Sequence, residues 1–283
     1  MRLTVLGKIL KRRRQPPIGE LMSDPLVLAY HAVSRNWPAT LATAPARLES
    51  QLEHLLRHGY EAITFVEAVH AASKEDANAN GGENGSRALC VTFDDAFRSV
   101  IERAFPIMER LGVKGTVFVP TAFAGQDRPM SWPGIEQWVG TEHEHELACM
   151  SWDELKQLSG AGWEIASHTQ THPHLTEIGD EQLREELVGS REEISERIGA
   201  PCRTIAYPFG DHDERVEQAV RDAGYEAAGG VRPGPRNLWV WPRIGVYPAD
   251  GPLRFRVKAS RGIRRARGSH LGTLLQRARG MRI

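Results

Sequence analysis

Two adjacent aspartates and a pair of histidines are the residues of this sequence whose types and spacing could do chemistry. Asp94 and Asp95 directly follow the apolar run ALCVTF, and neighbouring carboxylates at the end of a buried strand repel each other unless something compensates them. His168 and His172 stand four residues apart after WEIAS, a spacing that lets two imidazoles face one point. Two histidines and one aspartate would make a catalytic zinc-type site, in which three protein ligands leave one position open for water.

Such a site would divide the work between the two aspartates. One carboxylate would bind the divalent cation, and the other would stay ionised and take a proton from a water molecule that the metal acidifies. Each pair of residues also has an alternative explanation that involves no metal. Asp95 stands where it could cap a helix that begins near Phe97, which explains one aspartate but not the second. The alternative for His168 and His172 is a loop that binds nothing.

The elements predicted around these residues place them at one edge of a parallel sheet. Short apolar strands alternate with amphipathic helices from residue 26 to about residue 248, which is typical of a parallel sheet that closes into a barrel or is doubly wound. No GxGxxG motif follows the first strand, which disfavours a dinucleotide-binding fold. We predict strands at 26–31, 88–95, 115–123, 163–168, 203–210 and 225–231, and helices at 46–60, 99–112, 151–162, 180–199 and 213–224, with a further short strand and helix within 62–72.

In an α/β barrel, the loops that follow the strands form the active site. The unusual polar residues of this chain fall at such ends, which is the main reason to expect them to converge. They are His31, Asp94, Asp95, His168, His172 and the stretch Tyr207-Pro208-Phe209-Gly210.

Two other sets of residues are weak candidates for a metal site. His143 and His145 lie in TEHEHEL, where no predicted strand ends, so we expect a solvated loop there. Cys90, Cys149 and Cys202 form no CxxC pair, so they indicate neither a disulfide framework nor a thiolate site.

The composition is that of an ordinary soluble globular protein, with 41% hydrophobic and 25% charged residues in 283. No run of about 18 apolar residues predicts a transmembrane helix. The start, MRLTVLGKILKRRRQPP, has its basic cluster after its apolar stretch, which is the reverse of a secretory signal. We therefore expect a cytoplasmic protein.

The basic residues gather at the two ends of the chain. Residues 1–14 carry six Lys and Arg and residues 254–283 carry ten, in both cases without an acid. These ends are either solvated tails or a basic surface that binds an anionic membrane or a phosphate-bearing substrate. Nucleic acid is not expected as a partner, because the tails lack interleaved aromatic residues.

The stretches TFDDA, SHTQTH and AYPFG, in this order and each at the end of a predicted strand, resemble the motifs of the polysaccharide deacetylase family. This family is also called the NodB-homology or carbohydrate esterase family four. The resemblance covers residues 24–248 and extends through MSWDELKQLSGAGWEIASHTQTHPHL. It implies a distorted (β/α) barrel over residues 24–250, between a basic leader (1–23) and a basic C-terminal tail (251–283).

The resemblance also implies an activity and a set of site residues. Members are metal-dependent hydrolases that remove acetyl groups from N-acetylated sugars, and here one divalent ion is expected, with zinc preferred. Position by position, Asp95, His168 and His172 match the metal ligands of the family, and Asp94 matches its general base.

Two departures from the family pattern leave roles to be filled. Many members carry an arginine before the Pro-aromatic-Gly of the third motif, where this chain has Ala206. Arg243, in WPRIGVY, is our candidate to supply that guanidinium. The late Leu-x-x-His strand that provides the general acid in many members is also missing, since only His270 follows residue 248.

An early motif could fill the second gap. LAYHAV resembles the start of the biofilm-type poly-N-acetylglucosamine deacetylases, in which an early Tyr-His strand supplies the acid, so we assign protonation of the leaving amine to His31. The alternative for His31 is a core histidine bonded to backbone. A backbone N–H near Tyr207 is expected to stabilise the oxyanion. The residues expected to bind substrate are Tyr207, Pro208, Phe209, Trp239 and Trp241.

Two alternative functions stay open at this level. The same fold could hydrolyse a carbon–nitrogen bond outside sugars, or the chain could be a carbohydrate-binding barrel without activity. The intact Asp94, Asp95, His168 and His172 favour an enzyme, whereas Ala206 favours the inactive barrel.

Overall fold

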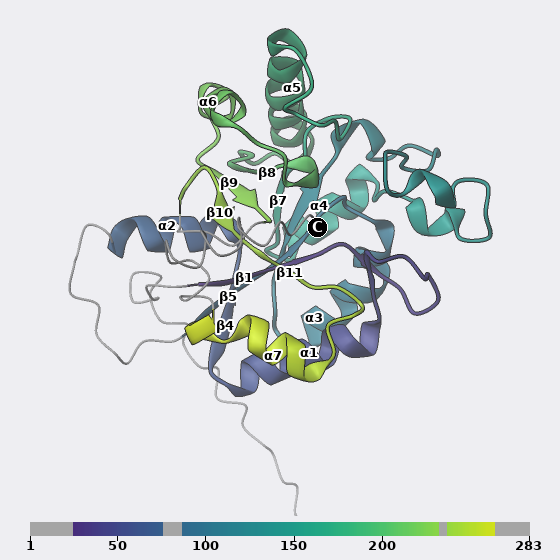
Figure 1. The fold of residues 1–283 in the computed structure, drawn as a ribbon, viewed down its shortest axis with the longest axis vertical. Helices are drawn as coiled ribbons and strands as arrows, with labels where there is room; N and C mark the ends of the chain where they lie inside the picture. The colour runs from purple at the N-terminus through teal and green to yellow at the C-terminus, as the bar shows by residue number, and fades with distance from the viewer. Residues whose placement is uncertain (1–24, 76–86, 232–236, 264–283) are drawn as a thin grey trace, which may run out of the picture.

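A single parallel sheet organises the protein (Figure 1), which is described for residues 25–75, 87–231 and 237–263 in a computed structural model. The sheet has nine strands in the order β10-β9-β8-β7-β6-β5-β1-β11, with β4 paired to β5. The strands are β1 (Leu26–Tyr30), β4 (Tyr60–Ile63), β5 (Arg87–Phe93), β6 (Thr116–Val119), β7 (Glu164–Ser167), β8 (Thr204–Ala206), β9 (Ala227–Gly230), β10 (Trp241–Pro242) and β11 (Ile244–Gly245).

The two ends of this sheet are joined by one short segment of chain, so the sheet is nearly closed. Trp241 of β10 lies in register with Gly229 of β9, whereas Ile244 of β11 lies in register with Leu28 of β1. Only Arg243 separates β10 from β11. The fold is therefore a distorted (β/α) barrel, as predicted, with its seam at Arg243.

Helices cover the outside of the barrel (Figure 1). They are α1 (Pro45–Arg57), α2 (Phe65–Glu75), α3 (Phe105–Arg110), α4 (Trp152–Gly160), α5 (Asp180–Ile198), α6 (Glu214–Asp222) and α7 (Pro252–Ala259). A separate pair of short strands, β2 (Ala32–Val33) and β3 (Ala42–Thr43), follows β1. Helix α4 begins with a capping box, in which the Glu154 N–H donates to Ser151 Oγ and the Ser151 N–H donates to Glu154 Oε2.

The strands alternate between two apolar clusters, as expected for a sheet that is buried on both faces. One set of side chains, which includes Val27, Cys90 and Phe118, fills the barrel interior. Phe65 of α2 enters the same cluster and packs edge-on against Phe118 and Trp241. Helix α2 thus closes the end of the barrel where the strands begin, which leaves the opposite end for the site.

Some predicted elements end earlier than the apolar pattern indicated. The helix predicted at 99–112 is a π-helical turn, Val100–Ala104, followed by α3. The strand predicted at 115–123 stops at Val119, before a 3₁₀ turn at Thr121–Phe123.

The predicted termini are described only in part. Residues 252–259, placed in the basic tail by the sequence, form α7 beside α1 (Figure 1), and the Phe255 side chain lies in the main core. The leader, residues 76–86 and the rest of the tail lie outside the described residues, so membrane association and a cytoplasmic location remain predictions. Among the helices that are described, none is both long and apolar enough to span a bilayer.

Candidate active site

The loops after β5, β7 and β8 hold the candidate residues in unusual backbone conformations. Five non-glycine residues of the described chain have positive φ, between 51° and 68°. All five fall in these three loops: Asp95, Ala96, Thr169, His172 and Phe209. Such backbone costs about 1–3 kcal/mol per residue and persists only where its surroundings enforce it, which is typical of functional sites.

Asp95, His168 and His172 come together as a buried cluster. Asp95 Oδ1 lies 3.3 Å from Nε2 of His168 and 3.3 Å from Nε2 of His172. It is the one group of three or more candidate ligands that the described residues form, with all ligand atoms within 4.8 Å of one another. Asp95 does not cap the helix that begins at Arg98, because its φ is 68° rather than extended and its buried Oδ1 accepts no hydrogen bond from the described residues.

The cluster fits a bound divalent metal. Asp95 Oδ1 is buried and accepts no hydrogen bond of good geometry from the described residues, so the two imidazoles face it without bonding it. Ligand atoms of a tetrahedral site with bonds of about 2.0 Å lie about 3.3 Å apart, which matches both distances. Burial by itself raises the pKa of Asp95, but the His168 and His172 side chains outweigh burial and lower it, so the carboxylate is ionised and able to bind a cation.

The rings of both histidines are held by their surroundings. His168 Nδ1 lies 2.8 Å from the Ala206 carbonyl oxygen, which leaves Nε2 free to bind a metal. The His172 ring stacks on Trp132, with centroids 4.1 Å apart, and meets the Phe209 ring edge-on at 4.6 Å. Ala206 stands where the family motif has an arginine, and it contributes its backbone carbonyl group to the site.

Arg243 supplies the guanidinium that Ala206 cannot. Its Nη1 donates to Asp94 Oδ1 at 2.6 Å and its Nη2 donates to Asp94 Oδ2 at 2.9 Å. Nη1 also donates to Thr92 Oγ1, and the guanidinium lies over the Phe118 ring. Burial by itself raises the pKa of Asp94, but the charge of Arg243 is the largest opposing effect and the pKa is lowered.

A glycine makes room for this arginine. A Cβ at Gly229 would lie 2.8 Å from Arg243 Nε, so any other residue there would displace the side chain. The pattern AAGG at 227–230 did not reveal this role, because only the folded barrel brings Gly229 against Arg243.

His31 is a further neighbour of the Asp94 carboxylate. Its Nε2 is 3.9 Å from Asp94 Oδ2, and its side chain is 17% exposed. Its Nδ1 is buried and has no hydrogen-bond partner among the described residues. The alternative of a core histidine bonded to backbone therefore does not describe His31, which faces both Asp94 and the solvent.

The residues predicted to bind substrate divide into two groups. Phe209 and Trp239 are half-buried and remain accessible. Tyr207 and Pro208 are buried, and the Tyr207 hydroxyl donates to the Trp239 carbonyl oxygen. The prediction for Trp241 is wrong, since its side chain is 2% exposed and fills the barrel interior, where no sugar can reach it.

The N–H of Tyr207 itself is not available to stabilise an oxyanion. The Tyr207 N–H donates to the Gly229 carbonyl oxygen at 3.3 Å, where it continues the pairing of β8 with β9. Trp132 supports the His172 ring by stacking on it, a role that ring type alone cannot indicate.

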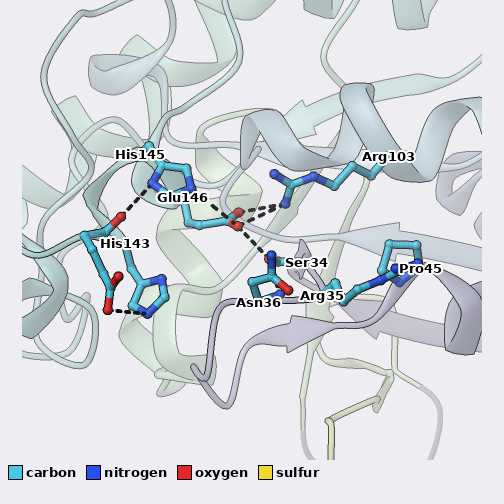
Figure 2. A pocket seen from close by; sticks show the side chains of 9 residues that line it. Ser34, Arg35, Asn36, Pro45, Arg103, His143, His145 and Glu146 are labelled. Carbon is cyan, nitrogen blue, oxygen red and sulfur yellow. Dashed lines mark hydrogen bonds and ion pairs between the residues drawn. The ribbon is translucent and has the colours of Figure 1, made fainter.

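His143 and His145 line a separate pocket of about 510 Å³ (Figure 2). The buried carboxylate of Glu146 lies in the same pocket, but it is already bonded by Ser34 Oγ at 2.6 Å and by Arg103 Nη1 at 2.9 Å (Figure 2). The His145 side chain is 66% exposed. Within the described ranges, these histidines do not belong to a group of three candidate ligands.

Comparison of the sequence with known proteins identifies the family. The family model for polysaccharide deacetylase matches residues 81–228, more than half of the chain. The chain is 23% identical over 226 residues to YxkH of Bacillus subtilis (strain 168), a protein named as a polysaccharide deacetylase, and the match covers 78% of this chain and 71% of that one. It is 24% identical over 192 residues to the poly-beta-1,6-N-acetyl-D-glucosamine N-deacetylase of Staphylococcus aureus (strain MRSA252), which covers 65% of this chain but only 59% of that relative.

Solved structures share the fold. The Streptococcus pyogenes deacetylase PplD in complex with acetate superposes with a TM-score of 0.67 at 20% identity, covering 83% of this chain and 98% of that one. IcaB from Ammonifex degensii superposes with a TM-score of 0.66 at 24% identity, covering 85% and 99%. The chain therefore belongs to the polysaccharide deacetylase family and is a carbohydrate deacetylase, a hydrolase.

Proposed function

We propose that this protein is a zinc-dependent enzyme that removes acetyl groups from the N-acetylated sugars of a polysaccharide or a glycan precursor. The observation that carries this proposal is the buried Asp95–His168–His172 cluster, placed directly after a second aspartate that Arg243 holds. Two imidazole nitrogens and one carboxylate oxygen are a donor set that suits zinc and leaves coordination positions open.

The proposed division of labour starts with Asp95, His168 and His172, which would hold the ion. A zinc ion held there would supply Lewis-acid chemistry, which would polarise the acetamide carbonyl and lower the pKa of water toward neutral pH. Asp94 is the proposed general base that takes the proton of the attacking water. Arg243 donates hydrogen bonds to both carboxylate oxygens of Asp94. These bonds fix the orientation of the carboxylate and keep it ionised inside the barrel.

His31 is the proposed general acid. An amide nitrogen must be protonated before it can leave, and a histidine is the side chain that most often does this near neutral pH. His31 lies on the accessible side of Asp94, at 3.9 Å from Oδ2, so both groups can reach one acetamide. This placement also supports assigning the chain to the subgroup with an early Tyr-His motif.

The substrate class follows from the relatives and from the accessible aromatic rings. The staphylococcal relative is named for poly-beta-1,6-N-acetyl-D-glucosamine, and we propose a polymer of N-acetylglucosamine as the first substrate to test. Phe209, whose ring packs on His172, and Trp239 are the half-buried rings that remain available for a sugar face.

The test is acetate release from a substrate panel by the zinc-loaded protein. The panel contains poly-N-acetylglucosamine oligomers, chitin oligomers, peptidoglycan fragments and a lipid-linked amino sugar. An acetylated amine that is not a sugar tests hydrolysis of carbon–nitrogen bonds outside sugars. Acetate from at least one sugar and none from the amine supports the proposal. Acetate from the amine alone would show that the bond hydrolysed lies outside sugars. Binding of oligomers without acetate release would show an inactive carbohydrate-binding barrel.

A further inference from the structure

A further side chain, that of Tyr247, lies against the inner face of β11 at Gly245. Gly245 lies in register with Ala29 of β1, and Ala29 lies in register with Thr92 of β5. Residues in register on neighbouring strands point to the same face of a sheet. Thr92 accepts a hydrogen bond from Arg243 inside the barrel, so the side of Gly245 without a side chain faces the interior.

The ring of Tyr247 occupies the space that Gly245 leaves. A Cβ on Gly245 would lie 2.7 Å from the Tyr247 hydroxyl oxygen and 2.8 Å from its Cε2. The hydroxyl end of the ring therefore covers the inner face of β11, two residues beyond Arg243. A side chain at position 245 would push this hydroxyl out of the barrel mouth.

Tyr247 is anchored from its outer side. Its N–H donates to Asp250 Oδ2 at 3.0 Å, and Lys258 Nζ lies 5.3 Å from the centroid of its ring. Lys258 itself donates to Asp250 Oδ2 and to the Gly245 carbonyl oxygen. Helix α7 thus fixes the loop in which Tyr247 stands.

The hydroxyl of Tyr247 remains available to a ligand. Among the described residues, none forms a hydrogen bond with it. Burial raises the pKa of Tyr247, and the negative charges of Asp94 and Asp250 raise it further. The group is therefore a protonated phenol at neutral pH, and it lies on the inner face of the sheet, where Arg243 binds Asp94.

We propose that the Tyr247 hydroxyl binds a hydroxyl group of the sugar that is deacetylated and so positions the acetamide between Asp94 and His31. This inference rests on the proposed deacetylase function. A phenol both donates and accepts a hydrogen bond, as a sugar hydroxyl does, so the pair is complementary. Gly245 is the residue that makes this position possible.

The test combines two substitutions in a double-mutant cycle. Tyr247→Phe removes only the hydroxyl and should lower kcat/KM for an N-acetylglucosamine oligomer about tenfold, the value of one hydrogen bond to substrate. Gly245→Ala should displace the ring and cause a similar loss. In the Gly245→Ala background, Tyr247→Phe should then have little further effect, because the hydroxyl is already out of place.

Controls separate this role from folding and from metal binding. Tyr60→Phe removes a hydroxyl from β4 and should leave kcat/KM unchanged, while circular dichroism and zinc content should match wild type in all variants. Tyr247→Phe with wild-type kcat/KM would overturn the inference and leave the proposed function intact. If the wild type releases no acetate, the proposed function fails, and calorimetric affinity for the oligomer decides the inference: weaker binding by Tyr247→Phe supports it, and equal binding or no binding overturns it.

Discussion

Arg243 and Asp94 form a bidentate ion pair inside the barrel, although 149 positions separate them in the chain. Arg243 is also the residue between β10 and β11, which pair with opposite ends of the sheet. Closing the barrel and orienting Asp94 therefore depend on the same short segment. The Asp94 carboxylate therefore gains this partner only when the last strands have docked.

The first prediction concerns this ion pair. Arg243→Met leaves the Asp94 carboxylate buried without its partner, which should lower the free energy of unfolding by about 3–5 kcal/mol. Urea denaturation of the metal-free protein measures the change. The double variant Asp94→Asn with Arg243→Met removes both charges and should recover most of the loss. Equal stability of wild type and Arg243→Met would show that the pair contributes nothing to the fold.

The second prediction concerns the base. Asp94→Asn keeps the shape of the side chain and leaves Asp95, His168 and His172 in place. Zinc content should stay at the wild-type value, whereas kcat for acetate release should fall by about 10²–10⁴-fold, the usual contribution of a general base. Asp153→Asn, at an exposed position of α4, is the matched control. Unchanged turnover by Asp94→Asn would remove this residue as the base.

The third prediction concerns His31. Because its Nε2 faces Asp94 and the metal cluster does not include it, His31→Ala should lower kcat by about 10²-fold or more. Zinc affinity should change little. The acid's role is tested further with a substrate whose leaving amine is already a good leaving group, on which the variant should lose less activity. A variant that loses zinc but keeps the rate of the loaded enzyme would mean that His31 is a ligand.

Much of this site could be predicted from local sequence, for a physical reason. The apolar strands are short but end sharply at polar residues, so parallel packing alone brings Asp95, His168 and His172 to one rim. Their chemistry then limits what they can bind. Because Asp94 directly precedes Asp95 in the chain, the same strand end places it beside this cluster.

What local sequence could not predict is the seam of the barrel. Strands β10 and β11 have two residues each, too few to show a period, so nothing in WPRIGVY indicates that Trp241 points inward. Gly229 and Gly245 resemble ordinary glycines until Arg243 and Tyr247 are packed against them. Arg243 could be proposed as the partner of Asp94 only from the chemistry of the missing arginine.

The fourth prediction concerns pH and helix α2, which closes the far end of the barrel. Glu67 accepts a hydrogen bond from the Thr64 N–H at 2.7 Å and pairs with Lys114 at 2.7 Å. Burial by itself raises the pKa of Glu67, but these partners outweigh it and the pKa is lowered. A lowered pKa means that the folded state gains stability above the ordinary carboxyl pKa and loses it as the pH falls through the folded value.

Glu67→Gln should therefore be less stable than wild type at pH 7, and this difference should shrink as the pH falls below about 4.5. Thermal unfolding between pH 7 and pH 3 measures the difference in Tm. Glu61→Gln, an exposed position on β4, is the control and should track wild type throughout. A constant difference across this range would contradict the linkage.

The measurement that tests the central claim most directly is acetate release by metal-stripped protein to which zinc is returned stepwise. The account predicts no release from an N-acetylglucosamine oligomer by the stripped protein and full release at about one zinc ion per chain. His172→Ala should not be restored at this ratio, whereas His145→Ala, from the separate pocket, should behave as wild type. Release by the stripped protein at the rate of the loaded protein would contradict the account.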